Sequence, residues 1–224
     1  MVNFSILRNQ KEFILWRDKQ TAPIHFVPTM GSLHQGHYEL IQAAQKPSDQ
    51  ITPQVLVSIF VNPLQFGPHE DFEKYPRDAK TDFIKTEEFG ANAVWCPSIN
   101  EIFPENTTSN FKIIVPNYLT YNLCGKSRKK HFDGVITVIA RLLSLVRPKL
   151  IILGEKDWQQ LVIIRKFLND FNLPISLRTV GTVREKDGLA YSSRNKYLNN
   201  EERNRALILP KILAQTASDF RKNK

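Results

Sequence analysis

The sequence predicts an α/β protein built on an open parallel sheet with helices on both faces. Short apolar runs alternate along the chain with segments of helical periodicity, which is the pattern of βαβ units. Polar motifs directly follow several of these runs, at the positions where open α/β sheets carry their ligand sites. With 224 residues, 42% of them hydrophobic and 24% charged, the chain can bury a proper core.

The expected elements follow one another in a regular order. The first strand is 24–27, an apolar run that Pro28 stops, and a helical pattern comes after it. Strands are predicted at residues 24–27, 55–61, 92–95, 112–115, 150–153 and 175–180. Helices are predicted at residues 9–18, 37–45, 78–89, 133–146, 157–170 and 200–219. The polar segment 46–53 predicts a surface loop.

The composition argues against a secreted or membrane-bound protein. The first 13 residues contain no sustained apolar stretch, so no signal peptide is expected. The longest apolar stretches, 55–61 and 135–146, are too short to span a bilayer or are interrupted by Arg141. Cys96 and Cys124 do not form a secreted disulfide framework and are expected to be reduced thiols. We therefore expect a soluble cytoplasmic protein with no membrane partner.

Positive charge is concentrated in the second half of the chain. Residues 1–120 hold 10 Lys and Arg against 13 Asp and Glu, whereas residues 121–224 hold 21 against 9. Such a bias suits a nucleic-acid surface, an anionic small substrate or simple solubility. The densest cluster, 126–131, lacks interleaved aromatic residues apart from Phe132, and no nucleic-acid-binding motif accompanies it. No nucleic-acid partner is expected.

Two histidines around a glycine follow the first predicted strand, in the segment PTMGSLHQGH at 28–37. A helix opening near Gly36 would aim unpaired backbone N–H groups and the positive end of its dipole at an anion. His34 and His37 share one side of such a turn and could both donate to phosphate oxygens. A solvated turn, a structural pair and half of a metal site are the alternatives. A zinc site lacks further ligands, because the other histidines are scattered.

Two more motifs follow predicted strands. The loop 62–67 presents two amides, although on its own it is better explained as an ordinary loop. The segment 154–160 opens a helix, and Asp157 with Gln160 three residues later has the pattern of a capping box, which requires no function. Lys156 is not explained by that pattern, and a lysine between a strand end and a helix start can reach a phosphate.

Residues 182–195 supply a further motif with two hydroxyls followed by an arginine. Ser192, Ser193 and Arg194 could bind a pyrophosphate through O–H donors and a planar guanidinium. The same residues also suit a turn or a helix start. Arg128 and His131 precede the apolar segment 132–139, whose apolar face is expected to be core.

The order PTMGSLHQGH, FVNPLQFG, HFDGVITV, GEKDWQQ and VREKDGLAYSSRN resembles the pantothenate synthetase family, the pantoate–β-alanine ligases, over residues 22–209. The resemblance implies a nucleotidyltransferase with a Rossmann-like core and a phosphate-binding signature shared with class I aminoacyl-tRNA synthetases. It implies that ATP and (R)-pantoate form a pantoyl adenylate with release of pyrophosphate. β-Alanine would then attack the adenylate to give pantothenate and AMP.

The resemblance also assigns residues to roles. The triphosphate and the departing pyrophosphate are assigned to His34, His37, Lys156, Ser192, Ser193 and Arg194. ATP is further assigned to Met30, Gly36, Gly154, Asp157 and Val183, with Asp157 at the ribose and Val183 at the adenine. Pantoate is assigned to Gln65, Gln160, Val138, Ile139, Asn62, Tyr75 and Arg128.

This set of residues suits the implied chemistry. A carboxylate that attacks an α-phosphate meets like-charge repulsion and must expel an anion, so donors and cations are needed rather than a side-chain nucleophile. Mg²⁺ is implied because it usually neutralises triphosphate oxygens, although the sequence shows no all-protein metal site. Other nucleotidyltransferases with the same histidine motif are the alternative among enzymes, and an RNA-binding module is the alternative outside them. The segments GEKDWQQ and SSRN argue against the first alternative, and an RNA-binding module would leave all five motifs unexplained.

The resemblance finally implies a homodimer and a two-part chain. Residues 1–180 would be the Rossmann-like ATP- and pantoate-binding domain, and residues 181–224 the start of a small C-terminal lid domain. Family members commonly continue for several tens of residues, so this lid is expected to be incomplete. The chain also departs from the family at 128–130, where Arg-Pro-Gly or a similar sequence is usual, at Trp158, where tyrosine is usual, and at Leu153, where phenylalanine is usual.

Overall fold

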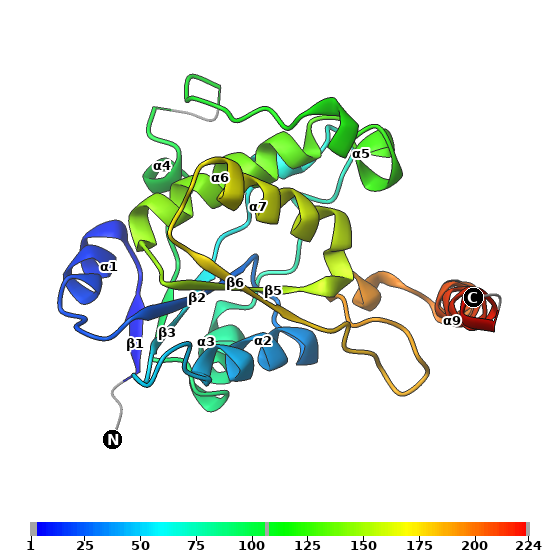
Figure 1. The fold of residues 1–224 in the computed structure, drawn as a ribbon, viewed down its shortest axis with the longest axis horizontal. Helices are drawn as coiled ribbons and strands as arrows, with labels where there is room; N and C mark the ends of the chain where they lie inside the picture. The colour runs from blue at the N-terminus through cyan, green and yellow to red at the C-terminus, as the bar shows by residue number, and fades with distance from the viewer. Residues whose placement is uncertain (1–3, 106–107, 223–224) are drawn as a thin grey trace.

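A single sheet of six parallel strands forms the centre of the computed structural model, which describes residues 4–105 and 108–222 (Figure 1). The strands are β1 (Ser5–Leu7), β2 (Ile24–Thr29), β3 (Gln54–Ile59), β4 (Ala93–Trp95), β5 (Leu150–Gly154) and β6 (Ser176–Val180). They lie in the order β1-β4-β3-β2-β5-β6. The chain therefore adds strands in one direction from β2 to β4 and then returns to add β5 on the other side of β2. β2 and β5 are the strands between which an α/β sheet of this kind binds its ligands.

The central strands are continuous apolar runs because both faces of the sheet are covered. Residues 55–58 and 150–153 are buried without alternation, as are 93–95. Two apolar clusters lie on the two faces, one around Phe26, Leu56 and Ile151 and the other around Val27, Val57 and Ile152. Alternate side chains of each strand thus enter opposite cores.

The helices form a layer on each side of the sheet. They are α1 (Gln10–Arg17), α2 (Gln35–Gln45), α3 (Ala79–Glu88), α4 (Ile99–Ile102), α5 (Leu123–Ser127), α6 (His131–Val146), α7 (Trp158–Asp170), α8 (Asn200–Ala206) and α9 (Ile208–Lys222). Short 3₁₀ turns are η1 (Pro63–Gln65), η2 (Asn117–Leu119), η3 (Glu155–Asp157) and η4 (Ser193–Tyr197). α6 and α7 cover one face, and α2 and α3 cover the other (Figure 1).

The prediction of an α/β fold with an open parallel sheet is confirmed, and five of the six predicted strands are present. The prediction of a strand at residues 112–115 is wrong. Its backbone donors are satisfied by α6 instead, since the N–H of Ile113 donates to Thr137 Oγ1 (2.9 Å) and the N–H of Val115 donates to Asp133 Oδ1 (2.8 Å). β1 was not predicted, because three residues are too few to show a periodicity.

The predicted helix at 200–219 is divided into α8 and α9. Pro210 is the reason, because proline lacks the N–H that a continuous helix would use and fits only the first turn of a new one. α9 projects from the body of the molecule (Figure 1). In the described part of the chain, residues 181–222 add no strand to the sheet. The division into domains at residue 180 stays a prediction. Residues 1–3, 106–107 and 223–224 of the two predicted domains lie outside the described residues.

A close contact between η1 and α6 fixes one wall of the later site. A Cβ on Gly134 would lie 2.1 Å from the carbonyl oxygen of Leu64, so only glycine allows η1 to approach this helix. Asn62, which is 1% exposed, joins the same elements by donating to the carbonyl of Gly134 (3.1 Å). Among the residues described, no helix is long and apolar enough to cross a membrane.

Candidate active site

A cavity opens where β2 and β5 end, and most of the predicted site residues line it. The predicted residues that line it are Met30, His34, His37, Asn62, Gln65, Tyr75, Arg128, Val138, Ile139, Lys156, Asp157, Gln160, Ser192, Ser193 and Arg194. They come from segments as far apart in sequence as Met30 and Arg194. The fold brings them together because parallel strands deliver their following loops to the same edge of the sheet.

Three predicted residues do not line this cavity. Gly36 lies in the first turn of α2, where a Cβ would come 3.1 Å from His34 Cε1, so glycine makes room for the imidazole. Gly154 ends β5 and has no atom within 4 Å of the position of a Cβ, which leaves open space beside it. Val183 lies beyond β6, and its carbonyl accepts from the N–H of Tyr191 (3.0 Å).

The two histidines face each other at the start of α2, which begins one residue after His34. Their ring centroids are 4.0 Å apart. The backbone N–H of His34 donates to Nδ1 of His37 (3.2 Å), so a neutral His37 carries its proton on Nε2. Nδ1 of His34 is buried against the first turn of α2, 3.2 Å from the position that a Cβ on Gly36 would take, and the two histidines form a capping box there. This nitrogen therefore faces the start of the helix.

Both imidazoles are held neutral. Burial, with Lys156 nearby, lowers the pKa of His34 to about 4. Burial and the neighbouring His34 lower the pKa of His37 well below its ordinary value. At neutral pH the pair therefore offers neutral N–H donors, and the positive charge at this end of the cavity comes from Lys156.

Lys156 and Asp157 lie in η3, directly after β5, and their charged groups are 3.6 Å apart. The capping box predicted for Asp157 and Gln160 is not formed. Asp157 is the N-cap residue of α7, but its side chain makes no capping hydrogen bond, because η3 precedes the helix. Its carboxylate is 62% exposed and can accept hydrogen bonds from a ligand.

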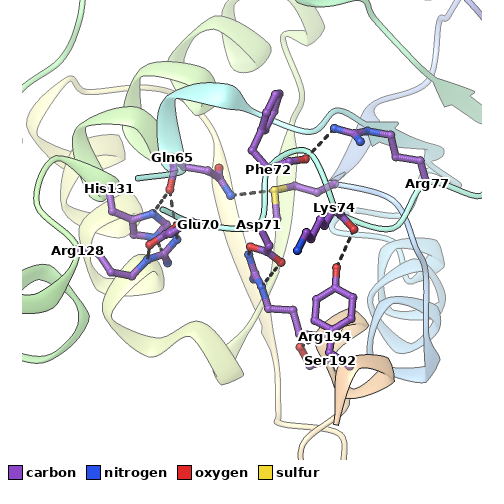
Figure 2. A network of polar contacts seen from close by, with 12 residues as sticks. Gln65, Glu70, Asp71, Phe72, Lys74, Arg77, Arg128, His131, Ser192 and Arg194 are labelled. Carbon is purple, nitrogen blue, oxygen red and sulfur yellow. Dashed lines mark hydrogen bonds and ion pairs between the residues drawn. The ribbon is translucent and has the colours of Figure 1, made fainter. Parts of the chain in front are cut away.

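Arg194 lies in a setting that the sequence did not indicate. Its Nε and Nη2 donate to the two carboxylate oxygens of Asp71 at 2.9 and 2.7 Å (Figure 2). Its guanidinium lies over the rings of Tyr75 and Phe66, at 5.5 and 5.8 Å from their centroids. Asp71 and the two rings therefore hold this arginine in a fixed position at the cavity wall, with its charge already paired.

Arg128, which also lines the cavity, has a similar arrangement. Its Nε donates to Glu70 Oε1 (2.6 Å), and its Nη1 donates to Nε2 of His131 (3.0 Å) (Figure 2). Nδ1 of His131 then donates to the carbonyl of Gln65 (2.7 Å). Burial lowers the pKa of His131, which fits a neutral ring with its proton on Nδ1. Adjacent carboxylates, Glu70 and Asp71, thus each hold one arginine of the site.

The two serines have different partners. Ser193 is 6% exposed, and its Oγ donates to the carbonyl of Ser32 (3.0 Å). Ser192 caps η4, since its Oγ accepts from the N–H of Arg194 (3.3 Å). Ser193 therefore joins the 192–197 segment to the histidine turn, and Ser192 is the serine whose hydroxyl proton has no partner in the described residues.

The glutamine side chains near the site also differ in their hydrogen-bond partners. Gln65 donates to Met30 Sδ (2.8 Å) and accepts from Asn62 (3.1 Å). Gln159 holds the loop before α5 through the carbonyls of Leu119 and Asn122 (2.9 and 3.0 Å). Within the described residues the side chain of Gln160 has no hydrogen-bond partner and lines the cavity, so its amide is available to a ligand.

One end of the cavity is apolar. Val138 and Ile139 were expected there. Further lining residues, to which the sequence assigned no role in the site, are Pro28, Thr29, Phe60, His131, Val135, Leu142 and Leu153. The helical spacing of 135, 138, 139 and 142 was a signal for them, because it places these side chains on one face of α6.

The site as a whole separates donors from apolar surface. His34, His37 and Lys156 lie close to one another and form a group suited to an anion, while Val135, Val138, Ile139 and Leu142 of α6 form an apolar group. Within the described residues there is no group of three or more His, Cys, Asp or Glu side chains that could hold a metal ion. The arrangement can bind a polyanion next to a small, partly apolar molecule, with amides between them.

Comparisons with known proteins agree on one family. The model described as "Pantoate-beta-alanine ligase" matches residues 4–224. A bifunctional pantoate ligase/cytidylate kinase of Prochlorococcus marinus strain MIT 9313 is 52% identical over 204 residues, which are 91% of this chain and 40% of that protein. Its namesake from Parasynechococcus marenigrum strain WH8102 is 49% identical over 208 residues, 93% of this chain and 40% of that protein. The chain thus spans about two fifths of the length of these curated relatives.

Two solved structures share the fold. The pantothenate synthetase of Thermus thermophilus has a TM-score of 0.85 and 41% identity, and the match covers 92% of this chain and 72% of that one. The pantoate-beta-alanine ligase of Francisella tularensis, complexed with beta-gamma ATP and beta-alanine, has a TM-score of 0.87 and 35% identity, with 94% and 79% covered.

Proposed function

The chain belongs to the pantoate-β-alanine ligase family, and we propose that it condenses (R)-pantoate with β-alanine in an ATP-dependent reaction that gives pantothenate. The observation that carries the proposal is that the cavity lining combines a group of donors suited to an anion, His34, His37 and Lys156, with an apolar group on α6. An ATP phosphate chain suits the first, and pantoate, with its hydroxyls, carboxylate and branched aliphatic centre, suits the second. The Francisella tularensis ligase, a complex with beta-gamma ATP and beta-alanine, supports this choice of substrates.

In the first step, the pantoate carboxylate attacks the α-phosphate of ATP, and pyrophosphate leaves. The new bond is a mixed anhydride, so the product is pantoyl adenylate. Nε2–H of His37 and the ammonium of Lys156 donate to the phosphates and stabilise the charge that develops on the leaving group. Gln65 and Gln160 orient pantoate, while Val138 and Ile139 contact its aliphatic part.

In the second step, the neutral amine of β-alanine attacks the activated acyl carbon and AMP leaves. The bond between the acyl carbon and the phosphate oxygen breaks as the amide bond forms, and the departing AMP phosphate takes up the proton that the amine loses. This step needs no side-chain nucleophile, because the site holds the two reactants next to each other. Asp157 accepts hydrogen bonds from the ribose hydroxyls and thereby keeps the adenylate in place. Gly154 and Val183 contact the adenosine.

Mg²⁺ is part of the proposal, as a counter-ion of the triphosphate. Among the described residues that line the cavity Asp157 is the one carboxylate, and Glu70 and Asp71 are each paired with an arginine, so the phosphate oxygens would supply most of its ligands. We further propose a cytoplasmic homodimer, for which the family resemblance is the support. Residues 181–224 would begin a lid over the site.

Exchange of labelled pyrophosphate into ATP tests the proposal. We expect exchange only when pantoate is present, and AMP release when β-alanine is then added. Exchange without pantoate would contradict the proposal and indicate another nucleotidyltransferase. An RNA-binding protein would show neither activity, and its affinity for RNA would fall steeply with salt.

A further inference from the structure

A buried carboxylate lies beneath the turn that carries the two histidines. Asp82 of α3 is 3% exposed. Its Oδ2 accepts from the backbone N–H of Ser32, and its Oδ1 accepts from that of Leu33, both at 2.8 Å. These two N–H groups lie between β2 and α2 and have no backbone partner among the described residues. One side chain therefore satisfies both donors of the turn.

The same turn is joined to the other half of the site. The carbonyl of Ser32 accepts from Oγ of Ser193 (3.0 Å), and its hydroxyl oxygen accepts from Nζ of Lys196 (3.3 Å). Ser32 has a left-handed backbone, with φ +49°, which costs energy for any residue but glycine. A strained residue that contacts two distant segments persists only when its surroundings fix it.

We propose that Asp82 is a positioning residue, which fixes Ser32 and Leu33 and thereby orients the two histidines at the start of α2 relative to the two serines at the start of η4. The proposal rests on the proposed function only for the identity of the bound phosphates. Asp82 does not line the cavity, so it acts through the turn and does not touch the substrate.

A carboxylate is the side chain that this position requires. It offers two acceptor oxygens on a short stem, and the two N–H groups need one each. Asparagine would present an NH₂ group to one of them, and that donor would face another donor. Alanine would leave two donors unpaired in a buried turn. The burial that raises the pKa of Asp82 is opposed by the same two N–H bonds, which favour its charged form.

The simpler explanation is that Asp82 only anchors α3 to the protein. Asp78, at the N-cap of the same helix, separates the two explanations. Its carboxylate accepts from the N–H of Thr81 (3.2 Å) and makes no hydrogen bond to the turn. Asp78→Ala therefore weakens α3 and leaves the turn intact, whereas Asp82→Asn removes an acceptor from the turn and leaves the N-cap intact.

The test compares these two variants by ¹⁵N NMR of the histidine rings and by pyrophosphate exchange. In the unaltered protein, Nδ1 of His37 accepts a hydrogen bond and Nε2 carries the proton. We expect Asp82→Asn to shift the ring signals of both histidines and to lower pantoate-dependent exchange ~100-fold, the typical effect of misplacing a catalytic group. We expect most of that loss in kcat, with a smaller change in the KM for ATP. Asp78→Ala should leave the ring signals where they are and should change the exchange rate by no more than about twofold.

Unchanged ring signals in Asp82→Asn, or the same changes in both variants, would overturn the proposal. The ring signals do not depend on the reaction. If the unaltered protein has no ligase activity, the proposed function is contradicted, but the NMR comparison of the two variants still tests the role of Asp82. If Asp82→Asn does not fold, amide hydrogen exchange of the unaltered protein decides. Ser32 and Leu33 should be protected at least ~100-fold although they lie in a turn, and exchange at the unfolded rate would overturn the proposal.

Discussion

The guanidinium of Arg194 forms a two-point ion pair with the carboxylate of Asp71, although 123 residues separate them in sequence. The pair gives the arginine one orientation at the wall of the cavity, above Tyr75. A cation that was expected to be free for phosphate is therefore already paired. Asp71 neutralises its charge, and the two hydrogen bonds of its planar guanidinium fix the position of the 192–197 segment.

The first prediction concerns this shape. Arg194→Lys keeps the charge but cannot form the two-point pair or stack on Tyr75. We expect pantoate-dependent pyrophosphate exchange to fall ~10- to 100-fold, by analogy with the loss of one oriented donor. Arg203→Lys is the matched control, because Arg203 makes a similar pair with Glu185 and Asp187 outside the cavity. Equal losses in both variants would show that the orientation of Arg194 has no special role.

The second prediction concerns the source of positive charge. Lys156→Ala should lower exchange ~100- to 1000-fold, because the leaving pyrophosphate loses a charged donor. His37→Ala should have an effect of the same order. The control is Lys166→Ala, which removes a lysine of α7 that pairs with Asp170 at 2.8 Å away from the cavity. An effect of less than tenfold for Lys156→Ala would place the phosphates elsewhere.

The third prediction concerns pH. His34 has a pKa of about 4 in the folded protein, against an ordinary value of 6.5, so the unfolded chain binds the proton first as pH falls. The stability that neutral His34 contributes is therefore complete above pH 6.5 and is lost as pH falls from 6.5 towards 4. His25, whose pKa burial also lowers, acts in the same direction.

Thermal unfolding followed at several pH values checks this effect. We expect Tm to fall between pH 6.5 and 4, and His34→Gln should show a smaller fall because it removes one of the titrating groups. A His34→Gln protein with the same pH dependence as the unaltered protein would contradict the prediction. Exchange activity should not depend on the titration of either histidine between pH 6.5 and 8, since both rings stay neutral there.

The fourth prediction concerns the loop before α6. Lys130 has a left-handed backbone, with φ +65°, at the position where the family often has glycine. Lys130→Gly should stabilise the protein by about 0.5–1 kcal/mol, because glycine has no Cβ to strain. Urea unfolding measures the difference. Lys129→Gly is the control and should be neutral or destabilising, since Lys129 is not among the residues of positive φ.

This loop also shows how the departure from the family is accommodated. Lys129 and Lys130 replace the residues that are usual before His131. In the structure, Arg128 donates to Glu70, and His131 donates to the carbonyl of Gln65. The backbone of Lys130 is left-handed, which costs energy for a residue with a Cβ.

The fold was predictable because its signals are local. The central strands are largely apolar runs, and the motifs at 28–37, 62–67 and 154–160 come directly after them. The wrong predictions of secondary structure also arose from ambiguity in the local sequence. Residues 112–115 have the composition of a strand, but Thr137 and Asp133 satisfy their backbone donors. The break before α9 could have been predicted from Pro210, which cannot lie inside a helix.

The fold class, the family and most of the residues gathered around the cavity follow from the amino-acid sequence alone, because motif order and apolar periodicity are carried by neighbouring residues. The groups that each of these residues contacts are known only from the folded molecule. Asp71 on Arg194, Glu70 on Arg128 and Asp82 beneath the histidine turn are partners from distant segments. No local pattern encodes such pairs, since they form only when the sheet brings several loops to one edge. That is why the charge and the orientation of the site residues, unlike their identity, depended on the fold.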